Sequence, residues 1–136
     1  FETKDRNEMK LLIEKAQIAQ DKINNLLPDD PEVLVLQAMI HTLWIVYDPM
    51  ANGRQLSSVV LNIYKMAEGI SPNNPRVVLN KAKFEMGMAQ YFGQDTKPFC
   101  EQITKSIQLF ANFKPKTNLY PNWGLDRAEE ALQNCK

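Results

Sequence analysis

The feature that most constrains this chain is a repeated signal that ends one helix and starts the next. The segments beginning at Pro28 and Pro72 read PDDPEVLVLQA and PNNPRVVLNKA, and they lie 44 residues apart. In each copy an Asp or Asn precedes a proline. The Asx side chain can cap free backbone N–H groups, while the proline takes the first helical position, where no donor is needed. The repeat therefore predicts that Asp30 and Asn74 cap two equivalent helices.

Apolar residues recur at three- and four-residue steps along six stretches, and no stretch shows the convincing alternation of a strand. We expect a turn-rich loop near 48–55 and an irregular stretch over 114–122. Asp5 followed by Glu8 predicts a capping box at the first helix. Short connections place successive helices antiparallel, so the predicted fold is all-α, built from antiparallel helical hairpins. The expected helices lie at about 5–27, 31–47, 56–70, 75–91, 97–113 and 123–135.

The third helix resembles the second helix of a tetratricopeptide repeat (TPR), with Val60, Tyr64 and Ala67 followed by Pro72. The first helix departs from that pattern because Gln20 stands where the family has an aromatic residue. The 44-residue period exceeds the family's 34, and we place the extra residues in the 48–55 loop. The tail, with Lys-Pro at 114–115 and Pro-Asn-Trp-Gly at 121–124, is similar to the ending of small exported bacterial proteins of this type.

The resemblance implies one TPR-like α-solenoid domain over 1–136. Its two full helix pairs would span about 31–113, between flanking helices at 5–27 and 123–135. It also implies a scaffold or adaptor that binds a protein or peptide in a concave groove. The groove would be lined by the exposed faces of two equivalent helices, with the residues Val35, Met39, Thr42, Leu79, Lys83 and Met86.

Periodicity alone points to a different face of the second helix, where Gln37, His41 and Asp48 form a polar stripe and Trp44 lies on the side away from Val35. Plain core packing of the methionines and aliphatic residues is a third interpretation, since such residues at helical spacing usually form a core. A structural subunit that homodimerises through apolar helix faces is the alternative function.

Composition argues against several other classes of function. Sixteen basic residues balance sixteen acidic ones, so the chain lacks the basic patch of a nucleic-acid-binding protein. No apolar run approaches the roughly 18–20 residues of a membrane span. One histidine and two distant cysteines do not have metal-ligand spacing, and no phosphate-binding glycine motif occurs. We therefore expect a protein that is not an enzyme and that uses neither a cofactor nor a metal.

The two cysteines predict a disulfide. Cys100 and Cys135 lie at nearly equal distances from the final irregular stretch, along helices that rise about 20 Å and about 18 Å. If those helices pack antiparallel, the two sulfur atoms are neighbours. The alternative is a pair of unpaired thiols packed as small hydrophobic groups. An oxidised pair places the protein outside a reducing cytosol, in the periplasm or as a secreted protein.

Overall fold

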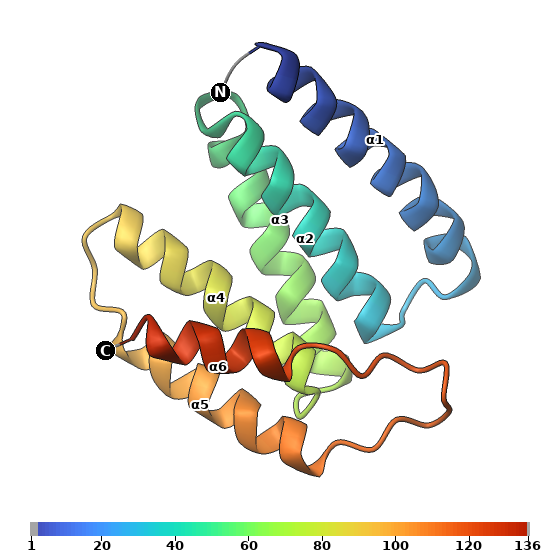
Figure 1. Cartoon of the computed structure of the whole chain (residues 1–136), viewed down its shortest axis with the longest axis vertical. Coiled ribbons are helices and arrows are strands. Elements are labelled where there is room, and N and C mark those ends of the chain that lie inside the picture. The colour runs from blue at the N-terminus through green and yellow to red at the C-terminus, as the bar shows by residue number, and fades with distance from the viewer. Residues whose placement is uncertain (1–2, 136) are drawn as a thin grey trace. The chain divides into compact units, whose positions relative to one another are not determined.

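A computed structural model describes residues 3–135, which form six α-helices and no strand (Figure 1). This confirms the all-α prediction. The chain divides into two compact units, of which the first ends at Ile70 and the second begins at Ser71. The helices are α1 Thr3–Leu26, α2 Pro31–Tyr47, α3 Pro49–Ile70, α4 Pro75–Tyr91, α5 Lys97–Asn112 and α6 Leu125–Gln133.

The first unit contains α1, α2 and α3, and α2 packs against both of the others. The loop over 27–30 separates α1 from α2, and the single residue Asp48 separates α2 from α3. Such short connections make neighbouring helices antiparallel. The buried apolar side chains of this unit are Ile13, Val33, Leu34, Val35, Ala38, Ile40, Val60, Tyr64 and Ala67.

The repeated helix starts are confirmed. The Asp30 carboxylate accepts hydrogen bonds from the backbone N–H groups of residues 32 and 33, at 2.8 and 3.3 Å. The Asn74 side-chain oxygen accepts the equivalent pair from residues 76 and 77, at 2.9 and 3.4 Å. Prolines at positions 31 and 75 begin the two helices, as the Pro-Asx-Asx-Pro pattern predicts.

Two predicted helix starts are wrong. Residues 49–55 belong to α3, because the Asp48 carboxylate accepts a hydrogen bond from the Ala51 N–H at 3.0 Å and Pro49 opens the helix. The extra residues of the 44-residue period therefore lengthen this helix instead of forming a loop. At the first helix, α1 already begins at Thr3, so Asp5 lies inside its first turn and does not cap it.

The second unit contains α4, α5 and α6, and α5 packs against both of the others. Its core is a cluster of small and medium apolar side chains, with half-buried aromatic residues around it. The buried members of that cluster are Leu79, Ala82, Met86, Ile103, Ala128 and Ala131.

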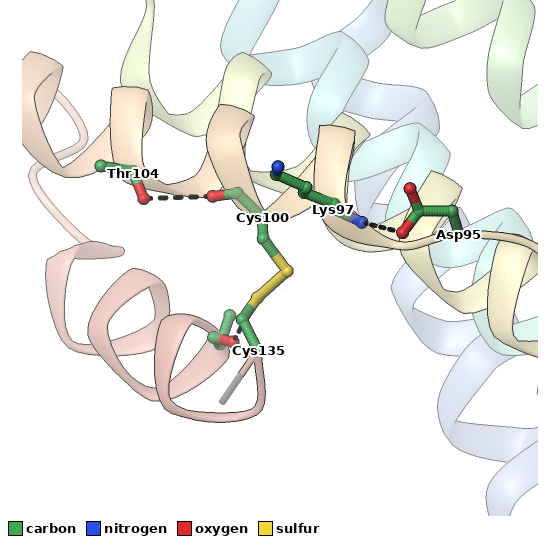
Figure 2. Close-up of a disulfide and its surroundings, with 6 residues drawn as sticks. Asp95, Lys97, Cys100, Thr104 and Cys135 are labelled. Atoms are coloured by element: carbon green, nitrogen blue, oxygen red, sulfur yellow. Dashed lines mark hydrogen bonds between the residues drawn. A yellow bond between two sulfur atoms is a disulfide. The ribbon is translucent and has the colours of Figure 1, made fainter.

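A disulfide joins Cys100 on α5 to Cys135 just beyond α6, which confirms the predicted pair (Figure 2). The two Cα atoms are 6.0 Å apart, the ordinary separation for such a bond. Both cysteines also pack against the core cluster of the second unit. The bond therefore attaches the end of the last helix to the first turn of α5.

Candidate binding surface

Three of the six predicted groove residues are inside the protein. Val35 and Leu79 have no exposed surface, and Met86 is only 9% exposed. Leu79 and Met86 belong to the core cluster around Ile103, so their apolar side chains are used for folding. The expectation that these three side chains line an open groove is wrong, and the core-packing interpretation holds for them.

The other three predicted groove residues retain some exposure. Met39 and Thr42 on α2 are half-buried, and Lys83 on α4 is exposed. The Thr42 hydroxyl donates a hydrogen bond to the backbone carbonyl of Ala38 at 2.8 Å, within its own helix. The role of these residues in binding stays a prediction.

An exposed apolar stripe runs along α1. Leu12 is 65% exposed and Leu26 is 80% exposed, although a helix in a folded unit normally turns its apolar stripe inward. Four residues at successive steps of seven, four and three positions form the stripe. It spans about 21 Å at 1.5 Å per residue. They are Leu12, Ala19, Ile23 and Leu26.

The side of α1 that contacts α2 is rich in polar groups. The Gln20 carboxamide is buried and donates to the Val33 carbonyl on α2 at 2.7 Å. The Arg6 guanidinium donates to the Tyr47 carbonyl at 3.0 Å and lies 4.4 Å from the centroid of that tyrosine ring. Ile13 is buried on the same side of α1 as Gln20, so this side joins one apolar side chain to several polar contacts, and the apolar stripe of α1 remains on the outside.

A second exposed apolar group lies on α2, at Leu36 and Leu43, which are 37% and 43% exposed. On each helix an exposed residue comes one position before a residue of the α1–α2 contact: Ala19 precedes Gln20 on α1, and Leu36 precedes Gln37 on α2. One residue corresponds to about 100°, or roughly a quarter turn of helix. Since the two helices run antiparallel, equal displacements in the same sense bring both groups to the same side of the pair. We call this surface the α1–α2 apolar face: Leu12, Ala19, Ile23 and Leu26 of α1 with Leu36 and Leu43 of α2.

Two cations border this face. Lys15 and Lys22 are exposed on α1, each three residues after a member of the apolar stripe, at Leu12 and Ala19. Residues three apart on a helix are surface neighbours, so both ammonium groups can reach the edge of the apolar face. The arrangement can hold an apolar body with a negatively charged edge.

The α1–α2 interface also contains a chain of side-chain amides that ends at His41. The carboxamides of Gln17 and Gln37 exchange two hydrogen bonds, at 2.9 and 3.0 Å. Gln17 also donates to the Asp21 carboxylate at 2.8 Å, and the Gln37 amide nitrogen lies 3.2 Å from Nε2 of His41. Burial lowers the pKa of His41 below its ordinary value.

Within the polar stripe predicted on α2, Gln37 contacts α1 and His41 contacts Gln37, whereas Asp48 lies between α2 and α3. Gln37 and His41 are both half-buried. The sequence pattern did not predict the α1–α2 apolar face, because apolar residues at helical spacing normally lie on the buried side of a helix. The signal that could have revealed it is the run of polar residues at 17, 20 and 24, which is also at helical spacing.

Within residues 3–135, no group of three or more His, Cys, Asp or Glu side chains could hold a metal ion. None of the helices described within residues 3–135 has the length and apolar character of a membrane-spanning segment.

Comparison with known proteins informs the fold. No protein-family model and no curated protein sequence matches this chain. Among solved structures, the fold is similar to that of the HusA haemophore from Porphyromonas gingivalis, with a TM-score of 0.81 and 22% sequence identity. The match covers 97% of this chain and 66% of the haemophore chain, so this chain spans about two thirds of that protein's length. At this level of identity, the match establishes a shared helical fold.

Proposed function

We propose that this chain is a non-enzymatic binding protein that works outside the cytosol and holds its ligand on the α1–α2 apolar face. The observation that carries the proposal is the exposure of that face. Large aliphatic side chains such as Leu12 and Leu26 are left uncovered along several turns of helix. Contiguous apolar surface of this kind marks binding sites for partners or ligands in soluble proteins.

The ligand we propose is haem. The only chemistry that the haemophore's name indicates is the carriage of haem, and that protein shares this fold. Haem presents flat apolar faces and two carboxylates at one edge. The α1–α2 apolar face offers aliphatic side chains for the macrocycle, and the Lys15 and Lys22 ammonium groups can pair with the carboxylates.

Titration with haemin, followed by the Soret absorbance, tests this proposal. We expect saturable binding to the unmodified chain, and about tenfold or greater weakening by Ile23→Glu or Leu43→Glu, because each places a charge against an apolar ligand. Leu119→Glu is the matched control: Leu119 is 97% exposed in the second unit and should bind haemin like the unmodified chain. Equal affinity of all four proteins for haemin would show that haem does not bind on the α1–α2 apolar face.

The disulfide supports a site outside the cytosol. Disulfides persist in oxidising compartments such as the periplasm and the extracellular space, and they are rare in the reducing cytosol. The Cys100–Cys135 bond is therefore the expected state of a periplasmic or secreted protein. Blocking of free thiols in freshly harvested cells, followed by intact mass, tests the proposal. Two added blocking groups on the native protein would contradict it.

A helix of a partner protein is the second candidate ligand. The α1 stripe repeats at steps of seven, four and three residues, which is the spacing of a helix–helix contact in a coiled coil. The proposed TPR-like arrangement of helix pairs supports the same function, because repeats of that type bind extended peptides and helices. A second copy of this chain would give a homodimer.

Size-exclusion chromatography with light scattering separates these outcomes. A dimer that Ile23→Glu converts to a monomer would favour self-association over the binding of haem or a different protein. A monomer that binds haemin saturably would support the first candidate. A monomer that binds no haemin and is shifted by an added amphipathic helical peptide would support the second.

A further inference from the structure

We propose that His41 makes the α1–α2 interface sensitive to pH, so that protonation of this one side chain loosens α1. The device consists of Asp21, Gln17, Gln37 and His41, joined in that order by side-chain hydrogen bonds. Because α1 carries most of the α1–α2 apolar face, loosening it would weaken ligand binding in acid. That consequence rests on the proposed function, whereas the pH response of the interface does not.

The Asp21 carboxylate fixes the orientation of both amides. A carboxylate only accepts hydrogen bonds, so Gln17 must present its amide nitrogen to Asp21, at 2.8 Å. The second proton of that nitrogen goes to Gln37 Oε1 at 2.9 Å, and Gln17 Oε1 accepts from Gln37 Nε2 at 3.0 Å. Gln37 therefore has one amide proton left, and that proton points to His41.

The fixed orientation sets the tautomer of His41. Its Nε2 lies 3.2 Å from the Gln37 amide nitrogen, which is a donor, so Nε2 must accept. A neutral ring that accepts at Nε2 carries its proton on Nδ1. That Nδ1 is buried and finds no hydrogen-bond partner among the described residues. The ring is thus held neutral by the hydrogen bond on one side and has an unpartnered group on the other.

Protonation of Nε2 would set an N–H group against the amide N–H of Gln37. Turning the Gln37 amide over would relieve that contact but would place its nitrogen against the nitrogen of Gln17. Turning Gln17 as well would bring its carbonyl oxygen against the Asp21 carboxylate. Every rearrangement within the chain of amides therefore costs a hydrogen bond, either between Gln17 and Gln37 across the α1–α2 interface or between Gln17 and the exposed Asp21.

Other charged groups on the neighbouring helices are not the source of this sensitivity. Besides Asp21, the middle of α1 carries Lys10, Glu14, Lys15 and Lys22, and α3 carries Arg54, Lys65 and Glu68. The lowered pKa of His41 has burial as its cause. The effect therefore depends on the removal of the ring from water and on the donor that faces it.

Nitrogen-15 NMR of the imidazole tests the proposal directly, because His41 is the only histidine in the chain. At pH 7.5 we expect the proton on Nδ1, and we expect the titration midpoint to lie below that of an exposed histidine, at about 6.5. A proton on Nε2 at neutral pH, or a midpoint at or above that value, would overturn the proposal.

The variant Asp21→Asn separates the chain of amides from simple electrostatics. Removing a nearby negative charge would by itself move the His41 midpoint to lower pH. Our proposal predicts the opposite shift, because the introduced carboxamide can donate as well as accept, and both glutamine amides are then free to turn. Asp5→Asn on the same helix is the control and should leave the midpoint close to that of the unmodified chain. A downward shift in Asp21→Asn would contradict the proposal.

Hydrogen exchange then measures the loosening of α1 itself. Relative to α4, protection of α1 amides should fall below pH 6.5 by up to about tenfold per pH unit, the limit for one proton. His41→Gln removes the titration and should show no such fall. Identical profiles in the two proteins would overturn the proposal. None of these experiments uses a ligand, so they can fail while haemin binding stands, and haemin binding can fail while they succeed.

Discussion

The guanidinium of Arg76 donates a hydrogen bond of 3.0 Å to the backbone carbonyl of Trp123, 47 residues further along the chain. Arg76 has no exposed surface, and its Cζ lies 4.6 Å from the centroid of the Phe113 ring. The irregular segment over 113–124 thus begins and ends against one buried side chain in the first turn of α4. This contact holds the start of α6 in place.

Replacing Arg76 with methionine should destabilise the second unit by about 2–4 kcal/mol, because the Trp123 carbonyl loses its donor and the aromatic rings lose the cation. Arg76→Lys keeps the positive charge but lacks the planar guanidinium group. Its stability should therefore lie between that of Arg76→Met and that of the unmodified chain. Urea unfolding followed by the tryptophan fluorescence and by far-UV circular dichroism measures the difference. An Arg76→Met protein as stable as the unmodified chain would show that this contact does not hold the segment.

Gly124 has a φ of +120°, and a Cβ atom built there would lie 2.7 Å from Cζ of Phe110. We expect Gly124→Ala to cost about 2 kcal/mol or more, because the backbone is strained and the ring must move. Gly87→Ala is the matched control: Gly87 is helical, with open space around it, and alanine should stabilise that helix by about 0.5–1 kcal/mol. Equal thermal midpoints for the two variants would contradict this account of Gly124.

Reduction of the Cys100–Cys135 bond should release α6 before the rest of the second unit. The chain-entropy model gives roughly 3–4 kcal/mol for a loop of this length. We expect the amides of α6 to lose protection from hydrogen exchange when reductant is added, while those of α2 keep theirs. The double variant Cys100→Ser with Cys135→Ser should show the same exposure with or without reductant. Unchanged α6 protection after complete reduction would mean that packing alone fixes this helix.

The paired amides of Gln17 and Gln37 should behave as a unit. Gln17→Leu and Gln37→Leu should each cost about 1–2 kcal/mol, because each deprives the half-buried partner amide of the two hydrogen bonds that join the pair. The double variant should cost less than the sum, since no unpaired amide remains. Gln55→Leu, at an exposed glutamine of α3, is the control and should change stability little. Strict additivity would show that the two amides do not stabilise the α1–α2 interface.

Most helix boundaries could be predicted because local chemistry decides them. The helix starts at positions 30–31 and 74–75 depend on Asx caps and prolines near in sequence, and the break after Tyr91 lies beside Gly93, which has a φ of +67°. The helix start at Pro49 was missed because the Asp48 cap outweighs the turn-forming residues that follow it, among them Gly53.

The candidate surface could not be predicted because it depends on which side of α1 is buried. That helix has an apolar side and a polar side at the same spacing, and hydrophobicity alone favours burying Leu12 and Ile23. In the structure, polar contacts made by Arg6, Gln17 and Gln20 hold the other side against α2. Such contacts require a partner helix distant in sequence, and the residue pattern of one helix does not show it.

Methyl NMR with a diamagnetic porphyrin tests the central claim most directly. Zinc protoporphyrin shifts the resonances of methyl groups under its ring without paramagnetic broadening. We predict that titration moves the methyl signals of Leu12, Ile23, Leu36 and Leu43, and leaves those of Leu79 and Ile103 in the second unit unchanged. Saturable shifts confined to the second unit, or no shifts at porphyrin concentrations that saturate haemin binding, would contradict the assignment of the ligand to the α1–α2 apolar face.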